Sequence, residues 1–217
     1  MTRRLCANVM IAALAATIVP LAGARAQSAE PAARALTLTS PPPPPPAAEQ
    51  IAAAVLPLPE KMRATARVLG YNAGGKLVEL RPGAGGMTCL ADAPGDQRFH
   101  VACYANAMEP FMGRGRELRE QGVKGDQVDS VRFREVREGK LKMPAMPSTL
   151  YSLTGKITDW DAVTGKATGA ARLYVVYIPG ATSETTGLSA IPQKDGPWLM
   201  YPGTPKAHIM FTPGMSP

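Results

Sequence analysis

The sequence predicts an α+β domain, in which a mainly antiparallel β-sheet carries one or two packed helices and one disulfide. Three observations predict this class. After residue 60, short apolar runs alternate as strands do and are separated by turns rich in Gly, Pro and Asn. Residues 108–121 instead repeat their apolar side chains at helical spacing. Two cysteines, Cys89 and Cys103, lie within the strand-rich part.

The first 26 residues have the three parts of a secretory signal peptide. Arg3 and Arg4 form a positive start, residues 5–21 carry no charge, and Ala24-Arg25-Ala26 offers small residues at a cleavage site. The uncharged run is marginal for crossing a bilayer. We therefore expect a soluble periplasmic or secreted product that has no transmembrane segment after processing. The paired arginines leave the choice between the general and the twin-arginine export route open.

The net charge does not indicate nucleic-acid binding. The signal segment contains three arginines and no acid, so its removal lowers the formal charge from +7 to +4. A mildly basic exported protein is attracted weakly to acidic surfaces such as lipid headgroups or cell-wall polymers. The expected partner is a small molecule or an envelope component.

A proline-rich linker is predicted at residues 27–46, before a single α+β domain at residues 47–217. The linker ends in six prolines, Pro41–Pro46, which favour an extended polyproline II spacer. Recognition of this run by a partner is an open alternative. The domain then begins with a short helix at residues 47–56.

The next four segments are predicted strands. Residues 66–71 and 76–80 flank the turn Asn72–Gly75, as in a β-hairpin. Residues 87–90 and 99–104 form a second strand pair. Alternation along the last strand places one set of side chains on one face (Phe99, Val101 and Cys103) and another on the opposite face (His100 and Tyr104).

The two cysteines that remain after processing predict a disulfide between Cys89 and Cys103. An even count in an oxidising compartment favours a structural bond. The alternative, a redox pair, requires the closer C-x-x-C spacing.

Two helices are expected after these strands. Pro110 suits a first helical position and Gly122 suits the position after the last turn. Arg114, Arg116 and Arg119 alternate with Glu117 and Glu120, which favours a solvated helix face over an anion site. The apolar stripe consists of Met108, Phe111, Met112, Gly115 and Leu118. Residues 126–138 favour a polar helix, with a strand as the alternative.

The C-terminal part predicts four further strands at residues 150–153, 173–178, 198–201 and 208–211. Residues 173–178 are apolar at every position, which predicts a central strand buried on both faces. Residues 161–169 are rich in turn formers.

Candidate catalytic residues are few. The sequence has neither a G-x-S-x-G nor an S-x-x-K motif. His208 is the first candidate for a general base, and Ser183 and Glu184 lie in a hydroxyl-rich loop after the central strand. The competing interpretation is a hydrogen-bonded histidine on a sheet face and an ordinary polar turn.

Candidate ligand-binding residues are His100, Tyr104 and Arg114, and no cofactor motif is present. Met143 and Met146 are candidate Cu(I) ligands because thioethers select soft metals. Methionine also fills irregular core gaps, and this is the competing interpretation.

Three segments carry a resemblance to a family. They are residues 75–92 (from Gly75 through Arg81-Pro-Gly-Ala-Gly-Gly-Met-Thr-Cys89 to Asp92), Glu109-Pro-Phe-Met-Gly-Arg-Gly-Arg-Glu-Leu-Arg119, and residues 198–210. Together they resemble a family of exported bacterial proteins without an assigned activity. The resemblance implies export and one domain, and it implies no site residues.

The function that the sequence favours is a non-enzymatic exported domain that binds a ligand, a surface or a partner. One alternative is a hydrolase-like enzyme with its site near the C-terminal strands. The other is methionine-based copper handling.

Overall fold

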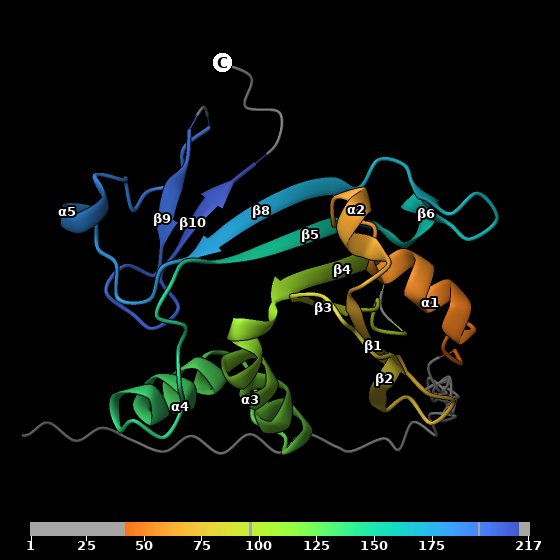
Figure 1. Cartoon of the computed structure of the whole chain (residues 1–217), viewed down its shortest axis with the longest axis horizontal. Helices are drawn as coiled ribbons and strands as arrows, with labels where there is room; N and C mark the ends of the chain where they lie inside the picture. The colour runs from red at the N-terminus through yellow and green to blue at the C-terminus, as the bar shows by residue number, and fades with distance from the viewer. Residues whose placement is uncertain (1–41, 96, 195, 213–217) are drawn as a thin grey trace, which may run out of the picture. The chain divides into compact units, whose positions relative to one another are not determined.

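A computed structural model describes residues 42–95, 97–194 and 196–212 and confirms the α+β class (Figure 1). The predicted signal peptide and the linker up to residue 41 lie outside the described residues. The helices are α1 (Ala47–Ala54), α2 (Glu60–Arg63), α3 (Glu109–Glu120), α4 (Asp126–Arg137) and α5 (Ser183–Thr186), with 3-10 turns η1 (Asn106–Met108) and η2 (Ile157–Asp159). The strands are β1 (Arg67–Tyr71), β2 (Leu77–Arg81), β3 (Met87–Leu90), β4 (Arg98–Ala105), β5 (Ser148–Lys156), β6 (Trp160–Asp161), β7 (Lys166–Ala167), β8 (Ala171–Tyr177), β9 (Trp198–Met200) and β10 (His208–Phe211).

Eight of these strands form one sheet in the order β2-β1-β3-β4-β5-β8-β10-β9. The predicted hairpin is confirmed as β1 and β2, whose turn is closed by the Asn72 side-chain oxygen, which accepts from the backbone N–H groups of Gly74 and Lys76. Every other pairing in the sheet is antiparallel except that of β1 with β3, which is parallel. The remaining strands, β6 and β7, pair with each other within the stretch expected to be turns.

The loop between β2 and β3 needs glycine because it passes close to the start of β1. A Cβ on Gly83 would lie 2.3 Å from the Arg67 backbone nitrogen. A Cβ on Gly85 would lie 2.6 Å from the Thr65 hydroxyl oxygen. The absence of a side chain at Gly83 and Gly85 therefore lets this loop pass close to Thr65 and Arg67 on its way to β3.

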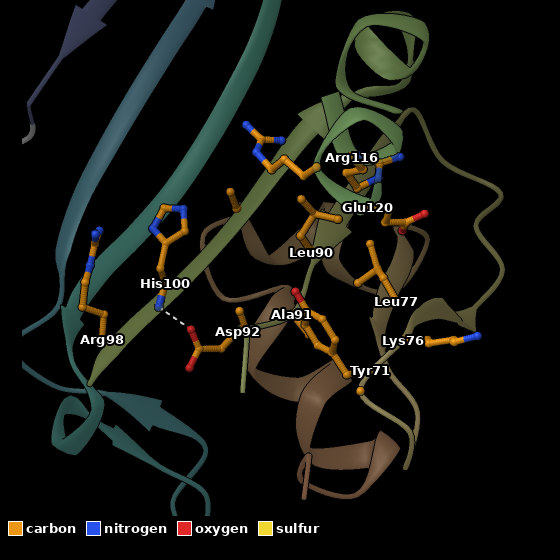
Figure 2. A pocket seen from close by; sticks show the side chains of 14 residues that line it. Tyr71, Lys76, Leu77, Leu90, Ala91, Asp92, Arg98, His100, Arg116 and Glu120 are labelled. Carbon is orange, nitrogen blue, oxygen red and sulfur yellow. Dashed lines mark hydrogen bonds between the residues drawn. The ribbon is translucent and has the colours of Figure 1, made fainter. Parts of the chain in front are cut away.

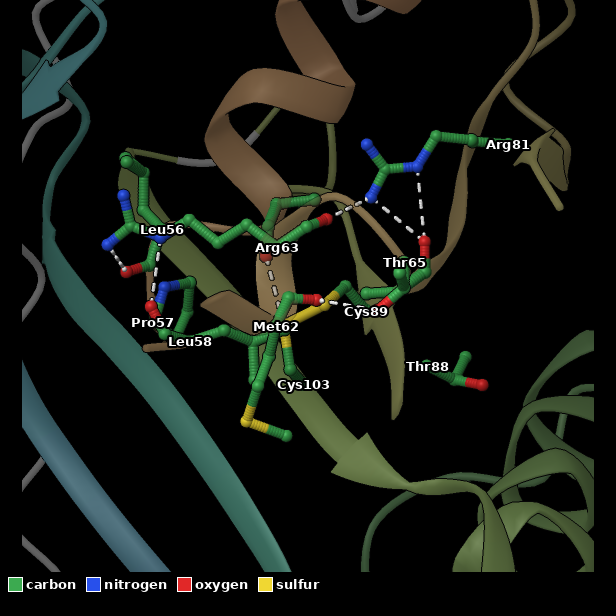
Figure 3. The surroundings of a disulfide bond; sticks show 12 residues. Leu56, Pro57, Leu58, Met62, Arg63, Thr65, Arg81, Thr88, Cys89 and Cys103 are labelled. Atoms are coloured by element: carbon green, nitrogen blue, oxygen red, sulfur yellow. Dashed lines mark hydrogen bonds between the residues drawn. A yellow bond between two sulfur atoms is a disulfide. The ribbon is translucent and has the colours of Figure 1, made fainter. Parts of the chain in front are cut away.

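The predicted disulfide is confirmed. Cys89 in β3 and Cys103 in β4 are directly opposite each other and bonded (Figure 3). Both are fully buried, in a core cluster with Ala54, Leu58 and Val68. The bond ties the two strands beneath the chain that runs from α1 into α2.

Helices cover both faces of the sheet. On one face, α1 lies against β1 and β4, over Val68, Phe99 and Val101. On the other face lie α3 and α4 (Figure 1), whose apolar side chains pack with those of β4 and β8. That cluster has Tyr104, Met108, Phe111, Val175 and Tyr177 at its centre. The helical stripe predicted from the sequence is thus the buried face of α3.

Residues 126–137 form helix α4, which decides between the two interpretations of this segment. The expectation of a polar helix does not mean that its polar residues are all exposed, because the charged side chain of Arg132 is only 4 % exposed. Its guanidinium lies 3.9 Å from the Phe111 ring centroid, donates to the Phe111 carbonyl oxygen at 3.1 Å and pairs with Asp129. A Cβ on Gly115 would lie 2.8 Å from Arg132 Nη1, so glycine makes room for this buried cation.

The prediction that residues 173–178 are buried on both faces is wrong. Strand β8 is interior to the sheet, and Val175 and Tyr177 are buried, but Tyr174 is 36 % exposed and Val176 only half-buried. The helix on that side of the sheet, α1, packs mainly against β1, β2 and β4, which are the strands at the other end of the sheet from β8 and its neighbour β10. Strand β5 is also longer than the expected 150–153. Throughout the described part of the chain, each helix is too short or too polar to cross a bilayer.

Candidate functional site

A cavity of about 870 Å³ lies on the α3 side of the sheet, beside β4 and the β1–β2 hairpin (Figure 2). In Figure 2, Arg98 and His100 approach it from β4, and Lys76 and Leu77 lie on the hairpin side. Its lining is Tyr71, Gly75, Lys76, Leu77, Leu90, Ala91, Asp92, Ala93, Arg98, His100, Ala102, Arg116, Arg119 and Glu120.

The alternation of β4 brings His100 to this cavity, as the sequence predicts for its face of the strand. The imidazole Nδ1 is hydrogen-bonded to the Thr154 hydroxyl at 2.7 Å, from the position directly opposite in β5. The backbone N–H of His100 donates to Asp92 Oδ1 at 2.7 Å (Figure 2). The first bond fixes the imidazole against β5, and the second fixes the loop that follows β3 against β4.

The charged lining is mainly cationic. Four cations line the cavity (Lys76, Arg98, Arg116 and Arg119), against two carboxylates (Asp92 and Glu120). Arg119 Nη1 donates to the Gly115 carbonyl oxygen at 3.0 Å. Among the described residues, the charged ends of Lys76, Arg119 and Glu120 form no ion pair, and all three side chains are exposed.

A hydrogen-bond network fixes Arg116. Its Nη1 donates to the Tyr104 hydroxyl at 2.8 Å, and its Nη2 pairs with Glu109 Oε1 at 2.7 Å. The Tyr104 hydroxyl in turn donates to Glu109 Oε2. Burial, followed by the bond to Glu109, raises the pKa of Tyr104 above its usual value, so the phenol stays protonated and remains a donor. Arg116 is thus paired with Glu109, whose Oε1 also lies 3.5 Å from Nη1 of Arg67.

The rest of the lining is apolar, with Tyr71, Leu77, Leu90 and Ala102 as its larger members. Binding sites for small molecules commonly combine such apolar walls with a few charged groups that orient the ligand. The arrangement can accept a molecule that has an apolar body and an anionic group.

The three ligand-binding candidates from the sequence are placed differently. His100 lines the cavity, and Tyr104 supports Arg116 from behind it. Arg114 is on another side of α3, where its Nη2 pairs with Glu135 at 2.8 Å. The hydrogen bonds from Arg114 lower the pKa of Glu135, and the pair joins α3 to α4.

Sequence reasoning did not select the other cations of the cavity. The alternation with glutamates predicts a solvated face for Arg116 and Arg119, but residues three apart also share one side of a helix, and here that side lines the cavity. Arg98 is two residues before His100, so strand alternation places both on one face. Lys76 carries no local signal, because it reaches the cavity only through the β1–β2 hairpin and the pairing of β1 with β3.

The first catalytic candidate, His208, is 6 % exposed and lies on β10. Its ring packs near those of Tyr177 and Tyr201, whose centroids are 5.0 and 5.7 Å away. Its Nδ1 donates to the Lys206 carbonyl oxygen at 2.7 Å. Burial lowers the pKa of His208 below its usual value, so the imidazole is neutral at neutral pH.

Ser183 and Glu184, the other catalytic candidates, form the start of α5. The Thr182 and Thr185 hydroxyls close a capping box around this single turn. The pKa of Glu184 is lowered by the Thr182 hydroxyl. Within residues 42–95, 97–194 and 196–212, no hydrogen bond joins His208 to either residue, so the structure does not assemble these three into one catalytic group.

The two methionine candidates are in different surroundings. Met143 packs against the core cluster under α3, whereas Met146 is 73 % exposed. Met108, Met112 and Met210 share that apolar cluster with Met143, which is the use of methionine as a core filler. Copper binding stays an untested prediction. Across the described residues, His, Cys, Asp and Glu side chains do not gather in groups of three that could hold a metal.

Comparison with known proteins identified no similar protein. No protein-family model matches the chain, and no curated protein or solved structure does.

Proposed function

We propose that this chain is an exported protein that binds a small organic acid in the cavity beside β4 without transforming it. Export is supported by the signal pattern of residues 1–26 and by the Cys89–Cys103 disulfide, since such bonds persist in oxidising compartments. The observation that carries the binding proposal is the lining of the cavity, which combines four cations and two carboxylates with apolar side chains.

Arg119 and Lys76 are the residues best suited to hold the acid group. Neither is neutralised by a described carboxylate, in contrast to Arg116, which is paired with Glu109. A guanidinium binds a carboxylate or phosphate through two parallel hydrogen bonds, and an ammonium adds a point charge. The apolar body of the ligand would then lie over Leu77, Leu90 and Tyr71.

Isothermal titration calorimetry with 3-phenylpropanoate tests the proposal on the protein purified from a bacterial periplasm. The amide of the same acid serves as the neutral control ligand. Arg119→Gln should lower the affinity for the anion at least tenfold, because a charge-assisted hydrogen bond contributes about 1.5–3 kcal/mol to binding. The matched control Arg137→Gln removes an exposed arginine of α4 and should leave the affinity unchanged.

Equal affinity for the acid and the amide would refute the proposal. So would equal effects of Arg119→Gln and Arg137→Gln. Export itself is checked by the mass of the periplasmic protein, which should begin at Gln27 and be two hydrogens lighter than the reduced chain.

Hydrolysis is a second candidate function, and one contact favours it. The Thr154 hydroxyl lies 2.7 Å from His100 Nδ1, the reach that a hydroxyl nucleophile needs from its base. Thr154→Val keeps the shape of the side chain and removes the hydroxyl. If the pair is catalytic, this variant abolishes turnover of 4-nitrophenyl esters, whereas a binding protein shows no turnover to lose.

A further inference from the structure

A second cavity, of about 360 Å³, lies beside α1 on the opposite face of β4. Phe99 faces this cavity and its neighbour His100 faces the first one. Its lining includes Pro42, Pro45, Glu49, Asp92, Phe99 and Trp160. Its volume is that of a site for a compound with one ring and a short side chain.

The walls of this second cavity are held in place before any ligand enters. Trp160 stacks on Phe99 with the ring planes 4° apart and the centroids 5.8 Å apart. Gln50 is buried, and its amide nitrogen donates to the carbonyl oxygens of Pro45 and Tyr71 at 2.7 and 2.8 Å. The end of the proline run is therefore fixed to α1 and to β1, which lowers the entropic cost of closing the walls around a ligand.

The charges of the second cavity are opposite to those of the first. Glu49 and Asp92 line it, and no lysine or arginine is among its lining residues. Glu49 Oε1 accepts one hydrogen bond from the Trp160 indole N–H at 3.2 Å. An ionised carboxylate has about four acceptor positions, so Glu49 retains capacity for a further donor.

We propose that this cavity binds a small primary amine with an apolar ring. The ammonium donates to Glu49, while the ring lies among the side chains of Pro42, Pro45 and Trp160. An ammonium near an indole also gains the attraction of a cation for the aromatic face. This site is separate from the organic-acid site, and its test does not depend on the outcome there.

The fluorescence of Trp160 reports the binding directly. The sequence has two tryptophans, and Trp198→Phe leaves Trp160 as the single one. Trp198 has its indole nitrogen buried without a hydrogen-bond partner among the described residues, so phenylalanine forfeits no hydrogen bond there. Phenethylamine is titrated into this variant, with 2-phenylethanol as the neutral ligand and 3-phenylpropanoate as the anionic one.

Saturable change of the Trp160 emission by phenethylamine is the expected result, with the alcohol and the acid binding at least tenfold more weakly. Glu49→Gln keeps an oxygen for the Trp160 N–H and should lower the affinity for the amine about tenfold. The control is Glu60→Gln, which replaces an acid of α2 outside the cavity and should leave the affinity unchanged. If Trp198→Phe fails to fold, calorimetry on the protein with both tryptophans compares the amine with the alcohol, and Glu49→Gln with Glu60→Gln. The acid is left out of that comparison because it is the ligand proposed for the first cavity. The proposal is overturned if the amine binds no more tightly than the alcohol, or if Glu49→Gln leaves the affinity for the amine unchanged.

Discussion

Phe99 and His100 are neighbours in β4, yet they serve two different cavities on the two faces of the sheet. Phe99 stacks on Trp160 in the acidic cavity beside α1, and His100 bonds to Thr154 in the basic cavity beside α3. Asp92 and Ala93 line both cavities, so the loop after β3 forms a wall that the two share.

Tyr104→Phe tests the network that supports the basic cavity. The substitution removes the hydroxyl that donates to Glu109 and accepts from Arg116, and leaves the buried ring in place. We expect the free energy of unfolding to fall by about 2 kcal/mol, since two hydrogen bonds to charged groups are lost while Arg116 and Glu109 remain paired with each other. Urea unfolding measures it. Tyr174→Phe, at an exposed position, is the control and should stay within about 0.5 kcal/mol of the parent.

Asp129→Asn tests how the buried guanidinium of Arg132 is held. Burial acts to raise the pKa of Asp129, but hydrogen bonds from Lys206 and Arg132 outweigh it and bring the pKa below its usual value. The carboxylate therefore stabilises the fold above the unfolded pKa, about 3.9, and this stability is lost as the pH falls through the lower folded pKa. At pH 7 the free energy of unfolding of the variant, measured by urea unfolding, should be roughly 2 kcal/mol lower than that of the parent.

The same variant should lose much less at pH 3, where the parent has begun to lose this contribution. Asp126→Asn, at the exposed start of α4, is the matched control and should cost less than about 1 kcal/mol. Equal losses for the two variants would contradict the role given to Asp129.

His208 makes stability depend on pH near neutrality. Because burial lowers its folded pKa, the unfolded chain takes up a proton at this histidine before the folded chain does. Stability is therefore complete above the unfolded pKa, about 6.5, and falls as the pH drops toward the folded pKa. Asparagine at position 208 keeps a donor for the Lys206 carbonyl and does not titrate. The loss of unfolding free energy between pH 7.5 and pH 5 should be smaller in His208→Asn than in the parent.

Removal of the disulfide should lower the free energy of unfolding by about 3 kcal/mol, as expected for a closed loop of about 15 residues. The variant Cys89→Ala/Cys103→Ala shows this in urea unfolding, because alanine suits the two fully buried positions. Reductant should destabilise the parent and leave the double variant unchanged. A parent that is equally stable with and without reductant would argue against a stabilising bond.

Local pattern was enough to predict several features that the structure confirms. The α+β class, the Cys89–Cys103 bond and the buried stripe of α3 follow from periodicity, cysteine count and turn residues, which act over a few residues along the chain. The same holds for the assignment of Phe99 and His100 to opposite faces, because strand geometry alone dictates it.

What only the tertiary structure decided is which distant residues meet. Parallel pairing of β1 with β3 places the hairpin residue Lys76 at the same cavity as Arg98 of β4 and Arg119 of α3. The Gln50 side chain is hydrogen-bonded to the backbone of Tyr71, and the Trp160 indole donates to Glu49. The spacing of these residues along the sequence does not predict either contact. Periodicity predicts the face on which a side chain lies. It does not predict what lies opposite that face, because this depends on the order of strands in the sheet and on how far each helix extends over it.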